Sequence, residues 1–257
     1  MTGVQTCALP ICGLTAIESG TFDLCKSLTT IDIPDSVAAI ADDAFIGCKA
    51  LQSFTLSPNH PYFFLADGAL CRTADSTLLL YPNAREPRTY RIPDGITAIS
   101  AYAFYDCDLL ESVVVPDSVT QLPARAFSGC SALASVSLPD SLTEIGTAAF
   151  SGCSALTGIR IPAAITEIIN HTFSGCTSLA TLEIPDSVTK IGDYAFLGCT
   201  LLTSIAIPDS VTAIGNSAFS NCTALTLTVT PDSYAAEYAQ ANNIPYTYPD
   251  ANDWLNN

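Results

Sequence analysis

Leu179–Cys199 reads LATLEIPDSVTKIGDYAFLGC, and close copies of this stretch occupy most of the 257-residue chain. The copies keep one phase, because the phenylalanine of each A-F-x-x-C element follows the previous one at a constant interval. A fixed period of about 23 residues is typical of a solenoid, in which each unit buries its apolar face only by stacking on its neighbours. We therefore predict one elongated repeat domain. The phenylalanines in phase are Phe104, Phe127, Phe150, Phe173, Phe196 and Phe219, and Phe22 and Phe45 form a further pair with the same spacing.

Each unit combines two extended pieces with turns. The L-x-x-L-x-L-P segment, as in Leu202–Pro208, places apolar residues on one side of a short strand. Proline ends the strand because it has no N–H to donate, and Pro-Asp-Ser favours a turn. V-T-x-I is a second extended piece. I-G-x-x-A-F-x-x-C is predicted to form about one helical turn that carries its Phe and Cys inward. The expected fold class is a repeat solenoid, mainly β with short helical turns.

The recurring set I-P-D-S-V-T-x-I-G-x-x-A-F-x-G-C resembles the leucine-rich repeats of the BspA type, found in surface proteins of gut and oral bacteria and of some parasitic protists. The resemblance covers Leu14 to about Tyr248. Individual copies depart from it, as where Asn221 replaces the glycine before Cys222. The resemblance implies a leucine-rich repeat fold and adhesion to host matrix proteins or to other cells.

Four parts of the chain depart from the plain repeat. Residues 1–11 resemble a translated sequencing adapter and are expected to be non-native, ahead of a single leucine-rich repeat domain over 12–248 and a tail over 249–257. The interval from Phe45 to Phe104 is much longer than two repeat periods, so one unit carries an insertion. We assign it to 57–90 and expect a β-hairpin that projects from the stack, because Asp67-Gly68 separates β-prone runs. Residues 232–243 are predicted to form a capping helix.

The charge balance argues against two classes of partner. The chain has 9 basic and 25 acidic residues, a net charge of −16. Such a surface repels phosphate backbones and anionic lipids, so we expect neither nucleic acid nor a membrane surface as a partner. The sequence also has no apolar run of about 18 residues, so no membrane insertion is expected.

Eight cysteines lie three residues after the repeat phenylalanines and are expected to form one internal column. A zinc site would require C-x-x-C pairs or nearby histidines. Disulfides between neighbouring units are compatible with the expected distances. A uniform inward column is most simply explained by small buried thiols, so we predict free cysteines. The column comprises Cys25, Cys48, Cys107, Cys130, Cys153, Cys176, Cys199 and Cys222.

Catalysis and cofactor binding have little support in the sequence. The only histidines are His60 and His171, and no nucleophile elbow, HExxH motif or phosphate-binding glycine loop occurs. A row of aspartates after proline could attract Ca²⁺, but the row breaks at Ala163 and its turn chemistry explains it. We predict no enzyme activity, no cofactor and no metal. The row comprises Asp35, Asp117, Asp140, Asp186 and Asp209, extended by Asp94 and Asp232.

The outward face of the strands is the predicted binding surface. In L-x-x-L-x-L the third and fifth positions point away from the core. The third is almost always a hydroxyl residue, whereas the fifth varies, and a variable position within a constant frame can encode recognition. The alternative is that this surface is merely unconstrained. The fifth-position residues are Asp32, Thr55, Arg91, Val114, Ser137, Arg160, Glu183 and Ala206.

A rival patch consists of aromatic residues in the insertion, which could instead pack the hairpin onto the solenoid. They are Tyr62, Phe63, Phe64 and Tyr81. From the surface and the resemblance together, we expect a non-catalytic interaction module of a secreted or cell-surface protein that binds a protein or glycan on host or neighbouring cells. The alternative is a structural spacer segment of a larger surface protein.

Overall fold

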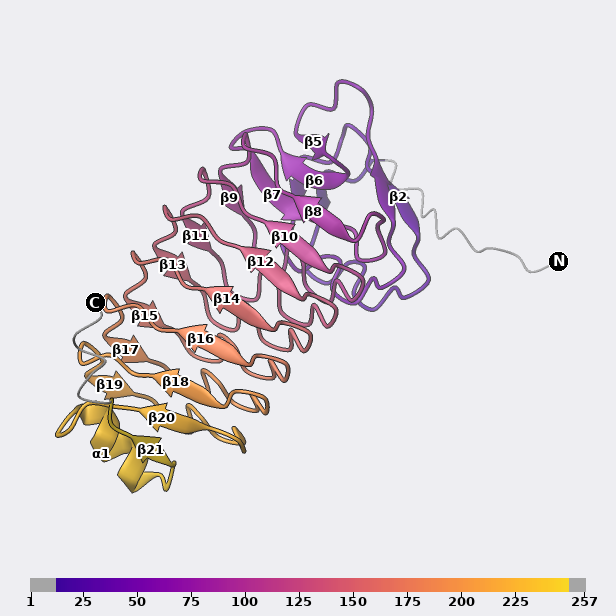
Figure 1. Ribbon diagram of the computed structural model, residues 1–257. Coiled ribbons are helices and arrows are strands. Elements are labelled where there is room, and N and C mark those ends of the chain that lie inside the picture. Colours follow the sequence, from indigo (N-terminus) through magenta and orange to yellow (C-terminus); the bar gives the residue numbers. More distant parts are fainter. Residues whose placement is uncertain (1–12, 250–257) are drawn as a thin grey trace.

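The computed structural model describes residues 13–249, and it confirms the repeat solenoid (Figure 1). The predicted segment 1–11 and the tail beyond Pro249 lie outside the described residues. Successive windings lie side by side along one axis, from β2 at one end to β21 and the helix α1 at the other (Figure 1). None of the described helices is long and apolar enough to cross a membrane.

Three-residue parallel strands form the first side of the solenoid. Partners in the ladder lie 23 residues apart, as Asp32 and Thr55 do, because each winding repeats the same pattern. The spacing changes at the C-terminal end, where Ser204 pairs with Thr226 and Leu227 pairs with Tyr246. The strands are β2 (Thr30–Asp32), β4 (Ser53–Thr55), β8 (Thr89–Arg91), β10 (Ser112–Val114), β12 (Ser135–Ser137), β14 (Gly158–Arg160), β16 (Thr181–Glu183), β18 (Ser204–Ala206) and β20 (Thr226–Thr228).

Two-residue strands form the second side, and they come from the V-T-x-I segments. In each strand the second residue, an isoleucine or leucine, is buried and the first is more exposed. In β13, for example, Ile145 is buried and Glu144 is exposed. These strands also pair in parallel, so they tie the windings together a second time. They are β1 (Ala16–Ile17), β3 (Ala39–Ile40), β9 (Ala98–Ile99), β11 (Gln121–Leu122), β13 (Glu144–Ile145), β15 (Glu167–Ile168), β17 (Lys190–Ile191) and β19 (Ala213–Ile214).

The third side differs from the predicted helical turn. Its residues form consecutive turns, in which alternate N–H groups donate to the next winding. Thus Arg125 N donates to Thr147 O at 2.9 Å, and Phe127 N donates to Ala149 O at 2.9 Å. A helical turn would direct its N–H groups to carbonyls four residues earlier in the same segment and could not join neighbouring windings. Arg125 adopts a left-handed φ of 58°, which lets the backbone alternate in this way.

The interior contains the predicted phenylalanine and cysteine columns. Phe150 is fully buried, and its ring stacks on those of Phe127 and Phe173 with centroids 5.5 and 5.8 Å away. The thiol of Cys153 donates to Phe127 O, 26 residues earlier, at 3.1 Å. Every other thiol of the column from Cys48 onward donates in the same way to the carbonyl oxygen 26 residues earlier. All nine cysteines of the described residues are free, which confirms the prediction of free thiols.

The insertion lies within the stack and does not project from it as predicted. Its strands β5 (Phe63–Ala66), β6 (Ala69–Arg72) and β7 (Thr77–Leu80) are antiparallel, and β7 then pairs in parallel with β9. The reason is that β7 is buried along its whole length. Leu79 and Leu80 belong to the core of the first windings, whereas Leu78 belongs to the core of the later ones. The insertion therefore separates two hydrophobic clusters.

Tyr81 takes the place of a repeat phenylalanine at the end of the insertion. It lies one repeat period before Phe104 and stacks on that ring with a centroid distance of 5.3 Å. Burial raises the pKa of Tyr81 to about 12. The constant repeat spacing could have located Tyr81 in the sequence, but a search for phenylalanine alone does not find a tyrosine at this position.

The predicted capping helix is present as α1 (Tyr234–Ala241). Its N-cap is Ser233, whose hydroxyl accepts a hydrogen bond from Ala236 N at 3.2 Å. The helix buries Ala235, Ala236 and Ala239 against the last windings. The short strand β21 (Tyr246–Thr247), which was not predicted, then pairs with β20 and continues the first ladder by one more strand. The helix thus covers the apolar interior at this end of the solenoid.

His60 connects the insertion to the preceding windings, and its replacement by alanine should destabilise that junction. Its Nε2 lies 3.1 Å from Pro34 O, and its Nδ1 accepts from the N–H groups of Tyr62 and Phe63 at 3.3 and 3.2 Å. His60→Ala removes all three partners from a buried site, so we expect the free energy of unfolding to fall by about 2–3 kcal/mol. Urea denaturation measures the change. The exposed neighbour Asn59→Ala is the control and should change it by less than about 0.5 kcal/mol.

Candidate functional site

The eight residues of the predicted binding surface all lie at the last position of a strand in the first ladder. The residue before each of them points inward, so alternation along the strand turns the last side chain toward solvent. In β14, for example, Ile159 is buried and Arg160 is exposed. Seven of the eight residues are exposed, and Val114 is half-buried. We call this row, from Asp32 to Ala206, the outward column.

Thr228 extends the outward column by one strand and was missed in the sequence. It pairs with Ala206 in the ladder of β18 and β20. The last full winding is one residue shorter than the others, so counting one full repeat period from Ala206 does not arrive at Thr228. The extended pattern L-T-L-T-V in Leu225–Val229 was the signal that could have located it.

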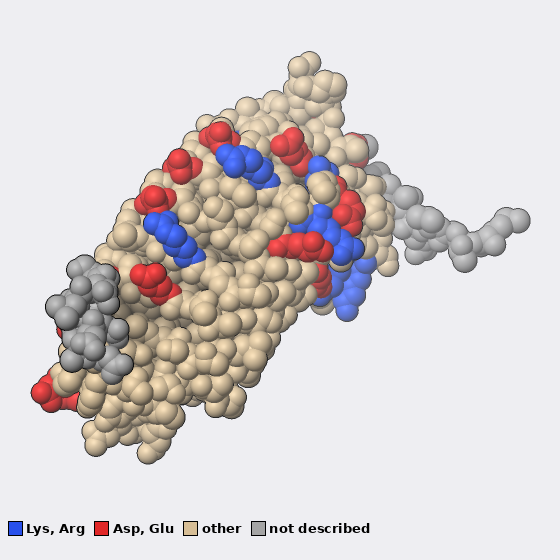
Figure 2. Space-filling view, in the orientation of Figure 1, with Lys and Arg blue, Asp and Glu red and all other residues tan. Residues whose placement is uncertain are grey.

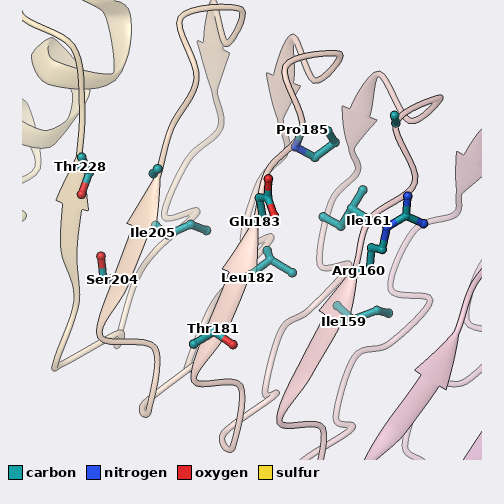
Figure 3. Close-up of a pocket in the computed structure, with 12 residues that line it drawn as sticks. Ile159, Arg160, Ile161, Thr181, Leu182, Glu183, Pro185, Ser204, Ile205 and Thr228 are labelled. Atoms are coloured by element: carbon teal, nitrogen blue, oxygen red, sulfur yellow. The ribbon is translucent and has the colours of Figure 1, made fainter. Parts of the chain in front are cut away.

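Two adjoining hollows follow the outward column along the sheet. One, of about 630 Å³, is lined by Arg91, Val114, Ser137 and Arg160 of the column. The other, of about 840 Å³, is lined by Arg160, Glu183, Ala206 and Thr228 (Figure 3). Arg160 lines both hollows, so six of the eight predicted residues border one open groove. Asp32 and Thr55 lie on the far side of the insertion, where Thr55 Oγ1 donates to Asp32 Oδ1 at 2.6 Å.

Two aspartates that follow proline in the turns, Asp94 and Asp140, border the groove and pair with its arginines. Arg91 forms an ion pair with Asp94 at 3.6 Å, and Arg160 forms one with Asp140 from the preceding winding. All four side chains are more than two-thirds exposed, so each pair contributes at most about 1 kcal/mol to stability. The arginines are therefore positioned by weak pairs that a charged partner can replace.

Charge is unevenly distributed over the face that carries the first ladder. Figure 2 shows acidic and basic atoms gathered toward the N-terminal part of this face, whereas the part over β18 and β20 carries few. The sequence agrees, since Ala206 and Thr228 are uncharged and the last charge of the column is Glu183. The groove thus runs from a charged end to an uncharged one.

The rival aromatic patch does not form one exposed surface. Phe63 and Tyr81 are 2% and 1% exposed, because they fill the cores on either side of the insertion. Phe64 is half-buried, which leaves Tyr62 as the exposed member. The four residues therefore do not form the exposed patch considered above. The burial of Phe63 and Tyr81 agrees with the alternative that these aromatic residues pack the hairpin onto the solenoid.

Two thiols of the cysteine column, Cys48 and Cys176, have pKa values well above neutral pH. Burial raises the pKa of Cys48 to about 11 and that of Cys176 to about 12. Burial likewise raises the pKa of Cys71, in the insertion, to about 12. A thiol with such a pKa stays protonated at neutral pH and is a poor nucleophile. Among residues 13–249, no three His, Cys, Asp or Glu side chains gather closely enough to hold a metal ion.

Comparison with solved structures finds similar bacterial proteins. A leucine-rich repeat protein from Eubacterium ventriosum is 26% identical with a TM-score of 0.64, over 76% of this chain and 59% of that one. A leucine-rich cell surface protein from Faecalibacterium prausnitzii is 33% identical with a TM-score of 0.61, over 91% of this chain and 60% of that one. A leucine-rich repeat protein of T. pallidum is 27% identical with a TM-score of 0.55, over 75% and 97% of the two chains.

The chain spans about 60% of the length of the first two of these proteins. A comparison with curated protein sequences gives no match. The family model of the BspA type leucine-rich repeat region matches residues 3–64 and 91–228, in six copies. The gap between the two matched ranges contains most of the hairpin β5–β7, where the structure also departs from the plain repeat. The chain therefore belongs to the family of BspA-type leucine-rich repeat proteins.

Proposed function

We propose that this chain is a non-catalytic interaction module of a secreted or cell-surface protein, and that it binds a protein or glycan along the outward column. The observation that carries the proposal is the groove bordered by six residues of that column. The residues around them repeat from winding to winding, whereas Arg91, Val114, Ser137, Arg160 and Glu183 differ in charge and size. A rigid frame with one variable row is suited to recognition.

Family membership supports the cellular location in the proposal. The similar protein from Faecalibacterium prausnitzii is described as a cell surface protein, and it is 33% identical to this chain. An extracellular location also suits a binding role on host or neighbouring cells. Adhesion to such cells is the finer part of the proposal.

The test compares two double variants with matched charge changes. Arg160→Gln with Glu183→Gln removes one cation and one anion from the groove, and both side chains are exposed. Lys190→Gln with Glu167→Gln removes the same charges from an exposed pair on the second ladder, where the two groups lie 4.0 Å apart. Both proteins are applied to an immobilised panel of extracellular matrix proteins and glycans, and their melting temperatures are measured alongside.

We expect the groove variant to lose about tenfold or more in affinity for any panel member that binds the parent protein. The control variant should bind as the parent does, and neither melting temperature should move by more than a few degrees. Equal binding by both variants would contradict the proposal and favour the spacer alternative, as would the absence of binding across the panel.

A further inference from the structure

A small pocket at the junction of the insertion and the first ladder concentrates basic side chains on an acidic protein. Its volume is about 290 Å³, and its polar walls come from Asp67, Arg85, Thr89 and Arg91. Tyr90 and Pro87 provide apolar parts of the wall. Three of the nine basic residues of the chain lie within residues 85–91, although the net charge is −16. This local excess of positive charge has no counterpart in the repeat pattern.

The two arginines of the pocket are available to a ligand to different degrees. Arg88, which lies between them in sequence, is already paired with Glu86 at 3.2 Å and with Glu111 at 3.1 Å. Arg91 has only the longer pair with Asp94, at 3.6 Å. Among the described residues, Arg85 has no carboxylate within ion-pair distance, although its side chain is half-buried. A half-buried guanidinium without a carboxylate favours an anionic partner.

The side chain of Arg85 packs across the turn of the hairpin. Its guanidinium lies directly against Gly68, where a Cβ atom would clash with it. Asp67 and Gly68 have φ values of 43° and 81°, the left-handed pair that closes a two-residue hairpin. The tight turn therefore leaves room for the side chain across its backbone. The guanidinium of Arg85 therefore lies against the backbone of the turn, at the edge of the pocket.

The chemistry of the walls selects one class of ligand. Two guanidinium groups suit a carboxylate, because the planar fork of arginine matches its two oxygens. Asp67 accepts hydrogen bonds and would repel a simple anion, but it suits the hydroxyl groups of a sugar. The volume exceeds that of a carboxylate alone and lies just below the range of drug-sized sites. We propose that this pocket binds one carboxylate-bearing sugar residue, with its carboxylate on Arg85 and Arg91 and its hydroxyls toward Asp67.

This inference stands apart from the groove proposal, since its main residues, Arg85 and Asp67, lie outside the groove. The test is a titration of the full chain with D-glucuronate and with N-acetylneuraminate, followed by chemical-shift changes in NMR spectra. D-Glucose, which lacks the carboxylate, and propionate, which lacks the hydroxyls, are the comparison compounds. We expect at least one of the two sugar acids to bind about tenfold or more tightly than both comparison compounds.

Variants assign the binding to the pocket. Arg85→Gln should weaken binding of the sugar acid about tenfold or more, whereas Arg125→Gln, an arginine outside the pocket, should leave it unchanged. If Arg85→Gln fails to fold, Arg85→Lys, which keeps the charge but loses the planar fork, serves in its place. Asp67→Asn should reduce the preference for the sugar acid over propionate. The proposal is overturned if neither sugar acid binds, if glucose or propionate binds equally well, or if the pocket variants bind as the parent does.

Discussion

Phe150→Ala is expected to lower the free energy of unfolding by about 3–5 kcal/mol. The ring is fully buried and stacks between Phe127 and Phe173 at 5.5 and 5.8 Å, with interplanar angles of 2° and 3°. Its loss leaves a cavity in the middle of the larger hydrophobic cluster, shared by the windings on both sides. Neighbouring windings cannot close it, because the ladders on three sides fix their spacing. Urea denaturation followed by circular dichroism gives the midpoint and slope from which the change is calculated.

The matched control is Phe64→Ala in the insertion, where the side chain is only half-buried. Phe64→Ala should lower the free energy of unfolding by clearly less than Phe150→Ala does, because the folded protein buries less of the Phe64 ring. A Phe150→Ala variant no less stable than Phe64→Ala would contradict the stacked column. The comparison removes any effect common to all phenylalanine substitutions.

Raising the pH above 9.0 is expected to destabilise the fold steeply. The ordinary thiol pKa is 9.0, whereas burial raises that of Cys48 to about 11 and those of Cys71 and Cys176 to about 12. Below pH 9.0 these thiols are protonated in both states, so their contribution to stability is fully present. Above pH 9.0 the unfolded chain releases their protons while the folded chain keeps them. Stability should therefore fall by about 1.4 kcal/mol per pH unit for each such thiol, until the folded pKa is reached.

Urea denaturation at several pH values between 9.0 and about 11 measures this slope. Cys176→Ala is the informative variant, because it removes one of the buried thiols whose pKa is raised. Its slope should be shallower than that of the parent protein by about 1.4 kcal/mol per pH unit. An identical slope in both proteins would show that Cys176 does not keep its proton in the folded state, and the burial of the column would then be wrong.

The interior of the solenoid was predictable because its period is constant. Phe127, Phe150 and Phe173 recur at one spacing, and a position that repeats in every winding must face the same surroundings. The backbone of the third side was not predictable, because the spacing of three residues between Phe150 and Cys153 fits a helical turn as well as a series of turns. The hydrogen bonds that distinguish them join residues of different windings, as from Arg125 N to Thr147 O.

The insertion shows where local reasoning misleads. Asp67-Gly68 marks the turn of a hairpin, and the structure has one there. The sequence of the turn does not predict where the hairpin packs. The run Thr77–Leu80 was the better signal, because a strand that is apolar at successive positions is buried on both faces. Such a strand belongs between two cores and cannot project into solvent.

The outward column followed from alternation along each strand, but its surroundings did not. Arg160 pairs with Asp140, which lies 20 residues earlier and in the preceding winding. Such contacts depend on how the turns of neighbouring windings overlap, which no single repeat reveals. The pocket of Arg85 and Arg91 likewise arises only because the hairpin folds back beside β8.

The burial of the thiol column can be measured residue by residue. The folded protein is exposed briefly to iodoacetamide at a pH below 9.0, and the alkylated cysteines are identified by mass spectrometry against a sample unfolded in urea. The stacked windings predict that Cys130, Cys153, Cys176 and Cys199, all fully buried, stay unlabelled in the folded protein and react in the unfolded one. Labelling of these four cysteines at the same rate in both samples would contradict the solenoid core on which every inference above depends.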